Sequence, residues 1–178
     1  MGSEMCIRDR MEREWVHQKM MDNVRDLYLA ICLNDGSHRM IGYISLNNID
    51  HLNKTADAGG TVIGEKDCQD GFSMFEALKL LLDYAFLQLN MNRITASCLP
   101  DHFLAPYSLG AFGFEKEGRM HECIYKNGSY QDMDLYALLR KKYDKIESDG
   151  GYSIKSLVRR CTVSYTHLRA HETLRHLV

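Results

Sequence analysis

Two sets of histidine and cysteine side chains have types that could bind a metal ion. Cys98 and His102 are four residues apart, and His121 and Cys123 are two apart, so the two pairs could converge across strands. The second set is a series of histidines near the carboxyl end, namely His167, His171 and His176. Neither spacing matches a particular zinc site, so we predict no metal site. The cysteines are scattered without CxxC pairs, which indicates reduced thiols and not a disulfide framework.

The two ends of the chain encode related DNA. Gly2–Arg10 reads GSEMCIRDR, and Val163–Ala170 reads VSYTHLRA. A DNA string that encodes the first segment has a reverse complement that encodes the second, and the string resembles a transposase adaptor used in sequencing libraries. We therefore predict that residues 1–10 and 163–178 are adaptor-derived, and we exclude them from reasoning about the fold.

The composition excludes several classes of protein. The 178 residues carry a net charge of −2, whereas a nucleic-acid-binding surface needs a clustered excess of Lys and Arg. No apolar run approaches the roughly 20 residues that span a bilayer, and the chain does not start like a signal peptide. We expect a cytoplasmic protein with one domain and with neither nucleic-acid nor membrane partners.

The periodicity of apolar residues predicts an alternation of helices and strands. Phe72–Leu89 carries apolar residues at helical spacing in a wide stripe, which indicates a long helix packed on a sheet. Asn127-Gly128 between two apolar runs is typical of a tight hairpin. The expected elements are a helix over 11–22, strands over 25–33, 40–49 and 58–64, the helix over 72–89, a strand over 93–99, a short or broken helix within 100–112, and hairpin strands over 117–125 and 130–140.

The local sequence of two further segments predicts their conformation. Residues 51–57 (HLNKTAD) are polar and indicate a loop between the second and third strands. Pro106 lacks a backbone donor and restricts Ala105, so the helix within 100–112 is expected to be broken or to begin at Pro106. The complete order fits a mixed α/β sandwich with an antiparallel front half.

Several strings in this order resemble one family when they are taken together. They are MIGYISLNNID, NKTAD, VIGEKD, EALKLLLDYAF, NMNRI, LGAFGFEKEGRM and IYKNGSYQD, which lie between residues 40 and 132. The chain resembles the RimJ/RimL-like branch of the GNAT superfamily of acetyl-CoA-dependent N-acyltransferases. The resemblance implies an α/β fold with a mixed, mainly antiparallel sheet flanked by helices. It covers residues 11–147 as a partial domain that lacks the family's usual first strand and helix, and leaves 148–162 as a tail without assignment.

The resemblance implies a place for acetyl-CoA, the co-substrate. In the family, the strand that matches Val62, Ile63 and Gly64 holds the pantetheine chain. The pyrophosphate binds a glycine-rich loop that opens the long helix, and the matching residues are Gln69, Asp70, Gly71, Phe72, Ser73 and Met74.

Phe72 and Met74 stand where the family has glycines, and their side chains would obstruct a close approach of phosphate to the backbone. One interpretation is a turn slipped by one residue, in which the amides of Gly71 to Phe75 and the Ser73 hydroxyl face the anion. The alternative is that Phe72 and Met74 pack in the core and leave no site.

The resemblance also implies positions for the catalytic groups, and they are altered here. The family often has an Asn and a Tyr in the second helix, where this sequence has His102 and Leu109; Tyr107 is two residues away from the Tyr position. Asp57 matches a Glu that is common in this branch, and it is the first candidate for the general base that takes the amine proton. His102 and His121 are second candidates.

The implied function is acetyl transfer from acetyl-CoA to a primary amine on a small molecule or peptide. The acceptor could be a protein N-terminus, an amino sugar or a polyamine, and the chain could act as a homodimer. The alternative is a catalytically impaired GNAT-fold protein that serves binding or assembly.

Overall fold

The computed structural model describes residues 14, 17, 25–69, 72–102, 104–153, 155–157, 159 and 160. The helix expected over 11–22 lies outside this range except for Glu14 and His17, which are helical and exposed. Both segments that we interpret as adaptor-derived also lie outside it, as do Asp70 and Gly71.

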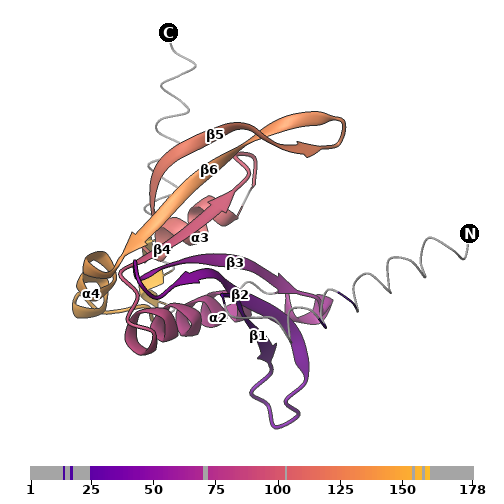
Figure 1. Cartoon of the computed structure of the whole chain (residues 1–178). Coiled ribbons are helices and arrows are strands. Elements are labelled where there is room, and N and C mark those ends of the chain that lie inside the picture. Colours follow the sequence, from indigo (N-terminus) through magenta and orange to yellow (C-terminus); the bar gives the residue numbers. More distant parts are fainter. Residues whose placement is uncertain are drawn as a thin grey trace, which may run out of the picture.

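Among the described residues, six strands pair into one sheet in the order β1-β2-β3-β4-β6-β5 (Figure 1). Neighbours are antiparallel except β3 and β4, which are parallel. The predicted mixed, mainly antiparallel sheet is therefore confirmed. The strands are β1 (Leu27–Cys32), β2 (Met40–Asp50), β3 (Thr55–Ile63), β4 (Arg93–Cys98), β5 (Glu115–Lys126) and β6 (Ser129–Leu139).

Turn chemistry explains the two hairpins at the ends of the sheet. Asp35 Oδ1 accepts a hydrogen bond from the Ser37 amide at 2.9 Å in the turn between β1 and β2. Between β5 and β6, Asn127 and Gly128 have φ angles of +53° and +83°, and two consecutive residues with positive φ form a turn that matches the twist of paired strands. The predicted hairpin around Asn127-Gly128 is confirmed.

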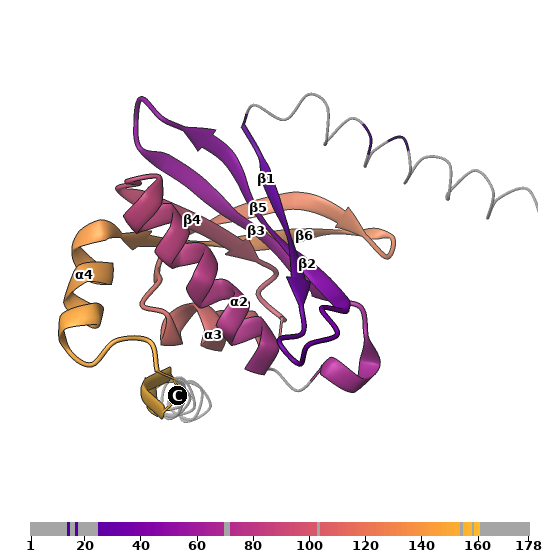
Figure 2. The ribbon, with the colours of Figure 1, turned by 90° about the horizontal axis from the view of Figure 1, so that it is seen from below.

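Helices cover one face of this sheet, where α2 crosses the strands with α3 and α4 beside it (Figure 2). The core lies between them and includes Leu81, Leu82, Phe86, Ile94 and Leu138, all at most 1% exposed. The helical elements are η1 (Lys66–Cys68), α2 (Phe72–Asp83), the π-helix η2 (Tyr84–Gln88), α3 (Ala105–Ala111) and α4 (Arg140–Ser148). No helix in the described part of the chain is long and apolar enough to cross a membrane.

The long predicted helix is confirmed, although its last turn is a π-helix. The short helix α3 begins at Ala105 and has Pro106 in its first turn, where the missing amide hydrogen costs no helical bond.

One expectation about the sequence order is wrong, and one helix was not predicted. Residues 55–57 are not loop, because they form the start of β3 and pair with Arg93–Thr95 of β4. The last strand ends at Leu139, and Arg140 begins α4, which the sequence pattern did not predict. In the segment after α4, Tyr152 and Leu157 are each 3% exposed and belong to the core.

Candidate functional site

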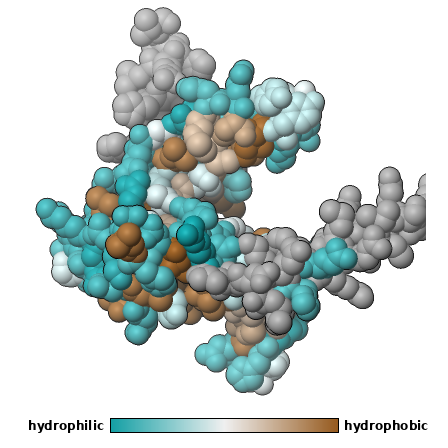
Figure 3. Space-filling model, viewed as in Figure 1, coloured by the Kyte–Doolittle hydropathy of each residue, from teal (hydrophilic) through white to brown (hydrophobic). Residues whose placement is uncertain are grey.

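The sheet splits between its two parallel strands. In the described part of the chain, β3 and β4 pair at three positions, Thr55–Asp57 with Arg93–Thr95. Beyond them β3 continues along β2, while β4 continues along β6 as far as Cys98. The strands diverge in Figure 1, and the surface in the same view is hollowed between them (Figure 3).

A β-bulge in β3 accounts for the split. The register moves from Ile44 opposite Thr61 to Leu46 opposite Ala58, so Gly59 and Gly60 together oppose Ser45 alone. Such a bulge bends its strand and increases its twist, and it turns β3 away from β4. A Cβ atom on Gly59 would lie 2.0 Å from Ser45 Oγ, so only glycine fits there without movement.

Some backbone N–H and C=O groups of β3 face the split and are not hydrogen-bonded to β2. The Gly64 amide donates to Ile41 O at 2.8 Å. Because antiparallel pairs alternate between bonded and non-bonded, Val62 is also bonded to β2, whereas the N–H and C=O groups of Ile63 and Thr61 point toward the split. Of the three predicted strand residues, Ile63 is therefore the one whose backbone groups face the split. Thr61, which the sequence did not predict as a site residue, faces it as well.

Gln69 reaches the same edge with its side chain. Its Nε2 donates to the carbonyl oxygen of Ile63 at 2.9 Å. The predicted loop residue Gln69 is thus in contact with the predicted strand residue Ile63. The carbonyl oxygen of Ile63 is already hydrogen-bonded by this side chain.

The N-terminus of α2 follows η1 at the end of β3. The helix begins at Phe72, and the first amides of a helix point out of its N-terminus, where an anion is favourable. Phe72 is 51% exposed, and Ser73 and Met74 are half-buried. Phe75 is also half-buried and stacks on Phe112 with ring centroids 5.7 Å apart. The alternative that Phe72 packs in the core is therefore wrong.

Asp57 lies where the split begins, at the last position at which β3 pairs with β4. Its neighbour Ala56 is in the core under the helices, and side chains alternate along a strand, so Asp57 points to the opposite face of the sheet. Asn48 Nδ2 donates to Asp57 Oδ2 at 2.7 Å, and the Thr95 hydroxyl donates to Oδ1. Two neutral donors thus fix the carboxylate in one orientation.

Asn48 reaches Asp57 because β2 also bulges there. Asn47 pairs with Asp57 and Asp50 pairs with Thr55, so Asn48 and Ile49 oppose the single residue Ala56. Asn48 adopts a φ of +50°, a left-handed conformation that is uncommon for a residue with a side chain. Neither Asn48 nor Thr95 was predicted, because the bulge that brings Asn48 to the carboxylate leaves no signal in the sequence.

The other candidate bases have different surroundings. His102 Nδ1 accepts hydrogen bonds from the amides of Leu104 at 3.3 Å and Ala105 at 3.1 Å, so this nitrogen caps the start of α3. His121 Nδ1 lies 3.1 Å from Asp132 Oδ2 on the β5–β6 hairpin. Leu109 is 9% exposed and part of the core.

Buried titratable groups lie around the end of β4, where it pairs with β6. Burial raises the pKa of the Cys98 thiol and raises the pKa of its neighbour Tyr136 to about 12. The Arg119 side chain donates to Asp134 Oδ1 at 2.6 Å, and this bond lowers the pKa of the Asp134 carboxyl. Within the described ranges, the cysteines are free thiols and no group of three or more ligand side chains could hold a metal ion.

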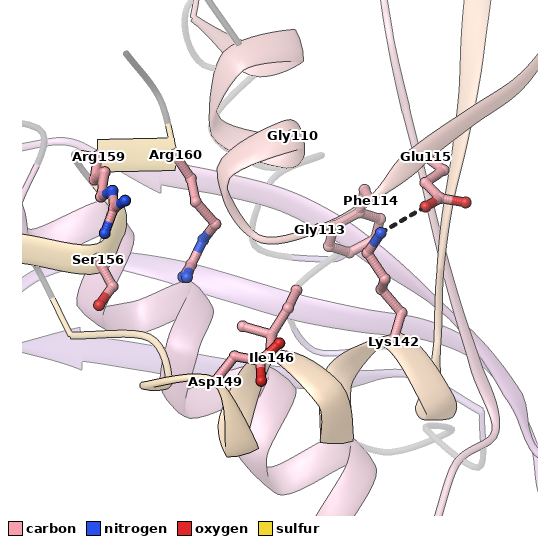
Figure 4. Close-up of a pocket in the computed structure, with 10 residues that line it drawn as sticks. All are labelled: Gly110, Gly113, Phe114, Glu115, Lys142, Ile146, Asp149, Ser156, Arg159 and Arg160. Carbon is pink, nitrogen blue, oxygen red and sulfur yellow. Dashed lines mark hydrogen bonds and ion pairs between the residues drawn. The ribbon is translucent and has the colours of Figure 1, made fainter. Parts of the chain in front are cut away.

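A cavity of about 540 Å³ lies away from the split, between the end of α3, the start of β5, α4 and the segment that follows α4 (Figure 4). Lys142 Nζ and Glu115 Oε1 form an ion pair across it at 2.8 Å. Arg160 donates to the carbonyl oxygen of Ala111 at 2.7 Å. The cavity contains none of the predicted site residues.

Comparisons with known proteins agree with this geometry. A family described as "Acetyltransferase (GNAT) domain" matches residues 8–135. An uncharacterized N-acetyltransferase p20 of Bacillus licheniformis is 33% identical over 104 residues, which are 58% of this chain and 57% of the relative. A putative ribosomal N-acetyltransferase YdaF of Bacillus subtilis is 30% identical over 112 residues, 63% of this chain and 59% of the relative. The chain thus spans less than two thirds of the length of these curated relatives.

A solved structure with the same fold is a spermidine N-acetyltransferase of Vibrio cholerae. It is 25% identical with a TM-score of 0.66, and the match covers 76% of both chains. The Vibrio cholerae spermidine N-acetyltransferase has also been solved as a dodecamer.

Proposed function

Because the chain belongs to the GNAT acetyltransferase family, we propose that it transfers an acetyl group from acetyl-CoA to a primary amine. The observation that supports this most strongly is the split between β3 and β4. There the strand edge at Thr61 and Ile63 offers backbone groups for the amides of pantetheine, as in the addition of a peptide strand to a sheet. The amides at the start of α2 lie at the end of β3 and suit the pyrophosphate.

In this proposal the amine approaches from the face of the sheet that carries Asp57. The amine nitrogen attacks the thioester carbon, the C–S bond breaks, and CoA leaves as a thiolate that takes a proton from solvent. The Asp57 carboxylate accepts the proton that the amine loses. His102 caps α3 through Nδ1, so we assign it to positioning that helix.

Direct transfer is favoured over an acetyl-cysteine intermediate. A cysteine nucleophile must be a thiolate, whereas burial raises the pKa of the Cys98 thiol, which lies at the end of β4. Positioning of the amine against the thioester can supply much of the rate enhancement by itself. This is consistent with Leu109 at the position where the family often has a tyrosine acid.

The names of two relatives support two acceptor classes. One is a putative ribosomal N-acetyltransferase and the other is a spermidine N-acetyltransferase. We propose a RimJ/RimL-like enzyme that acts in the cytoplasm on a polyamine or a protein N-terminus, and that assembles at least as a homodimer.

Acetyl-CoA binding tests the cofactor part of the proposal. Calorimetric titration is expected to give a dissociation constant for acetyl-CoA about 10-fold or more below that for 3′-phosphoadenosine 5′-diphosphate, which keeps the pyrophosphate and lacks pantetheine. Two backbone hydrogen bonds to Thr61 and Ile63 at about 1 kcal/mol each justify this difference. No heat and no thermal shift at millimolar acetyl-CoA would show that the split does not hold it.

A further inference from the structure

Asn47 carries a buried acceptor that nothing in the structure satisfies. Within the described residues, its side-chain oxygen Oδ1 is the one buried side-chain polar atom without a hydrogen-bond partner. Buried polar atoms in proteins are nearly always paired, and an exception calls for an explanation such as a missing ligand. The unpaired atom is an acceptor, so its partner must be an N–H or O–H donor.

The position of Asn47 links this acceptor to the proposed site. Asn47 in β2 lies directly opposite Asp57 in β3, and side chains of such pairs share one face with Cβ atoms about 4.5–5.5 Å apart. Leu46, the residue before Asn47, is buried in the core under the helices, so Asn47 points to the face that carries Asp57.

The two ends of the Asn47 amide have different surroundings. A Cβ atom on Gly59 would lie 2.6 Å from Asn47 Nδ2, so the amide nitrogen packs against the Gly59 backbone at the bulge. Oδ1, at the other end of the amide, is the atom without a partner. Asp57 beside it is held by Asn48 and Thr95, which leaves further lone pairs of its carboxylate available, since each oxygen can accept more than one bond.

We propose that Asn47 Oδ1 and the Asp57 carboxylate form a two-acceptor subsite for the acceptor amine, which the Asn47 side chain opens by a change of rotamer, because Oδ1 is closed to water-sized groups in this structure. This inference rests on the proposed function and adds a residue to it. A primary ammonium group has three N–H donors, so it can satisfy Asn47 and Asp57 together. One ammonium proton passes to solvent to give the neutral amine, and Asp57 then accepts the proton that the nitrogen loses as it attacks the thioester. A quaternary ammonium group carries the same charge but has no N–H, and it leaves Asn47 unpaired. The subsite thus selects cations that carry N–H groups.

Two variants of Asn47 test the subsite by kinetics. Asn47→Leu keeps the branched shape of the side chain and removes the acceptor, and Asn47→Ala removes the acceptor without adding apolar bulk. Both are expected to raise KM for the best acceptor amine about 10-fold, with kcat and the dissociation constant of acetyl-CoA within about 2-fold of wild type. Asn92→Ala, at an exposed asparagine, is the matched control.

Stability separates this role from a structural one. Replacing an unpaired buried acceptor by an apolar group of the same shape is neutral or stabilising, so Asn47→Leu is expected to melt no lower than wild type. A clear loss of thermal stability in Asn47→Leu, or an unchanged KM for the amine in both variants, would overturn the proposal.

A binding measurement keeps the test independent of turnover. Calorimetry with butylammonium and tetramethylammonium, each titrated into wild type and Asn47→Ala, is expected to show about 10-fold weaker binding of butylammonium to the variant and equal binding of tetramethylammonium. If wild type transfers no acetyl group but shows this pattern, the proposed function fails and the subsite stands. Equal binding of butylammonium to both proteins, or no binding to wild type, overturns the subsite.

Discussion

Asp57→Asn is expected to lower kcat by about 10²- to 10⁴-fold, the range in which a positioned general base contributes. The variant keeps the shape of the side chain, and its carboxamide oxygen can still accept from Asn48 or Thr95. It cannot take a proton from the amine. Steady-state rates at saturating acetyl-CoA measure the effect, and the dissociation constant of acetyl-CoA is expected to stay within about 2-fold, because Asp57 lies on the opposite face of the sheet from the helices that carry the anion site.

Asp50→Asn is the matched control. Asp50 is also a carboxylate of the β2–β3 pair with hydrogen bonds, because it accepts from the amides of Leu52 at 2.8 Å and Asn53 at 2.9 Å, but it lies at the end of β2 away from the split. Its kcat is expected to remain near wild type. A kcat for Asp57→Asn within 3-fold of wild type, in a protein that melts normally, would remove Asp57 from the mechanism.

Gly59→Ala and Gly60→Ala are expected to differ sharply although the two glycines are adjacent. A methyl group at position 59 would meet Ser45 Oγ at 2.0 Å and Asn47 Nδ2 at 2.6 Å, whereas nothing lies within 4 Å of one at position 60. Overpacking of this kind costs about 1–3 kcal/mol, which corresponds to a fall of roughly 2–12 °C in Tm for a chain of this size.

The two glycine variants also test whether the bulge positions Asn47 for the amine. Gly59→Ala has to move Asn47, so the amine KM is expected to rise together with the fall in Tm, while Gly60→Ala leaves both near wild type. Thermal melts and amine saturation curves provide the two readouts. Equal Tm values for the two variants would mean that the bulge is not packed as described.

The sequence allowed the prediction of the sheet and the long helix because their signals are local. Asn127-Gly128 determines a hairpin turn, and the apolar stripe of 72–89 appears at helical spacing. Residues 55–57 were misassigned to a loop because Thr, Ala and Asp carry no apolar pattern, although their backbone pairs with β4. The π-helix at Tyr84–Gln88 and the start of α4 at Arg140 have no comparable local signal.

The candidate site could be predicted in part. The resemblance led to Asp57, Ile63 and Gln69, which the structure places along the split. It could not distinguish Ile63 from Val62, because which backbone groups face the split depends on the alternation of bonded pairs in the β2–β3 ladder. Asn47 was not foreseen at all, since an unpaired acceptor is a property of the packed structure.

Two functions are considered for a protein with this fold, and the release of free CoA thiol distinguishes them. A catalytically impaired binding or assembly protein would hold acetyl-CoA without consuming it, even with many amines present. An acetyltransferase releases one equivalent of free CoA thiol for each acetylated amine.

Amine-dependent release of free thiol therefore tests the central claim most directly. The protein is incubated with acetyl-CoA and a panel that contains spermidine, an amino sugar and a peptide with a free N-terminus, and thiol is measured together with the mass of each amine. We expect thiol release above the hydrolysis background with one amine, a matching product heavier by one acetyl group, and the loss of both in Asp57→Asn. Acetyl-CoA that binds but yields neither thiol nor acetylated product with any amine would contradict it.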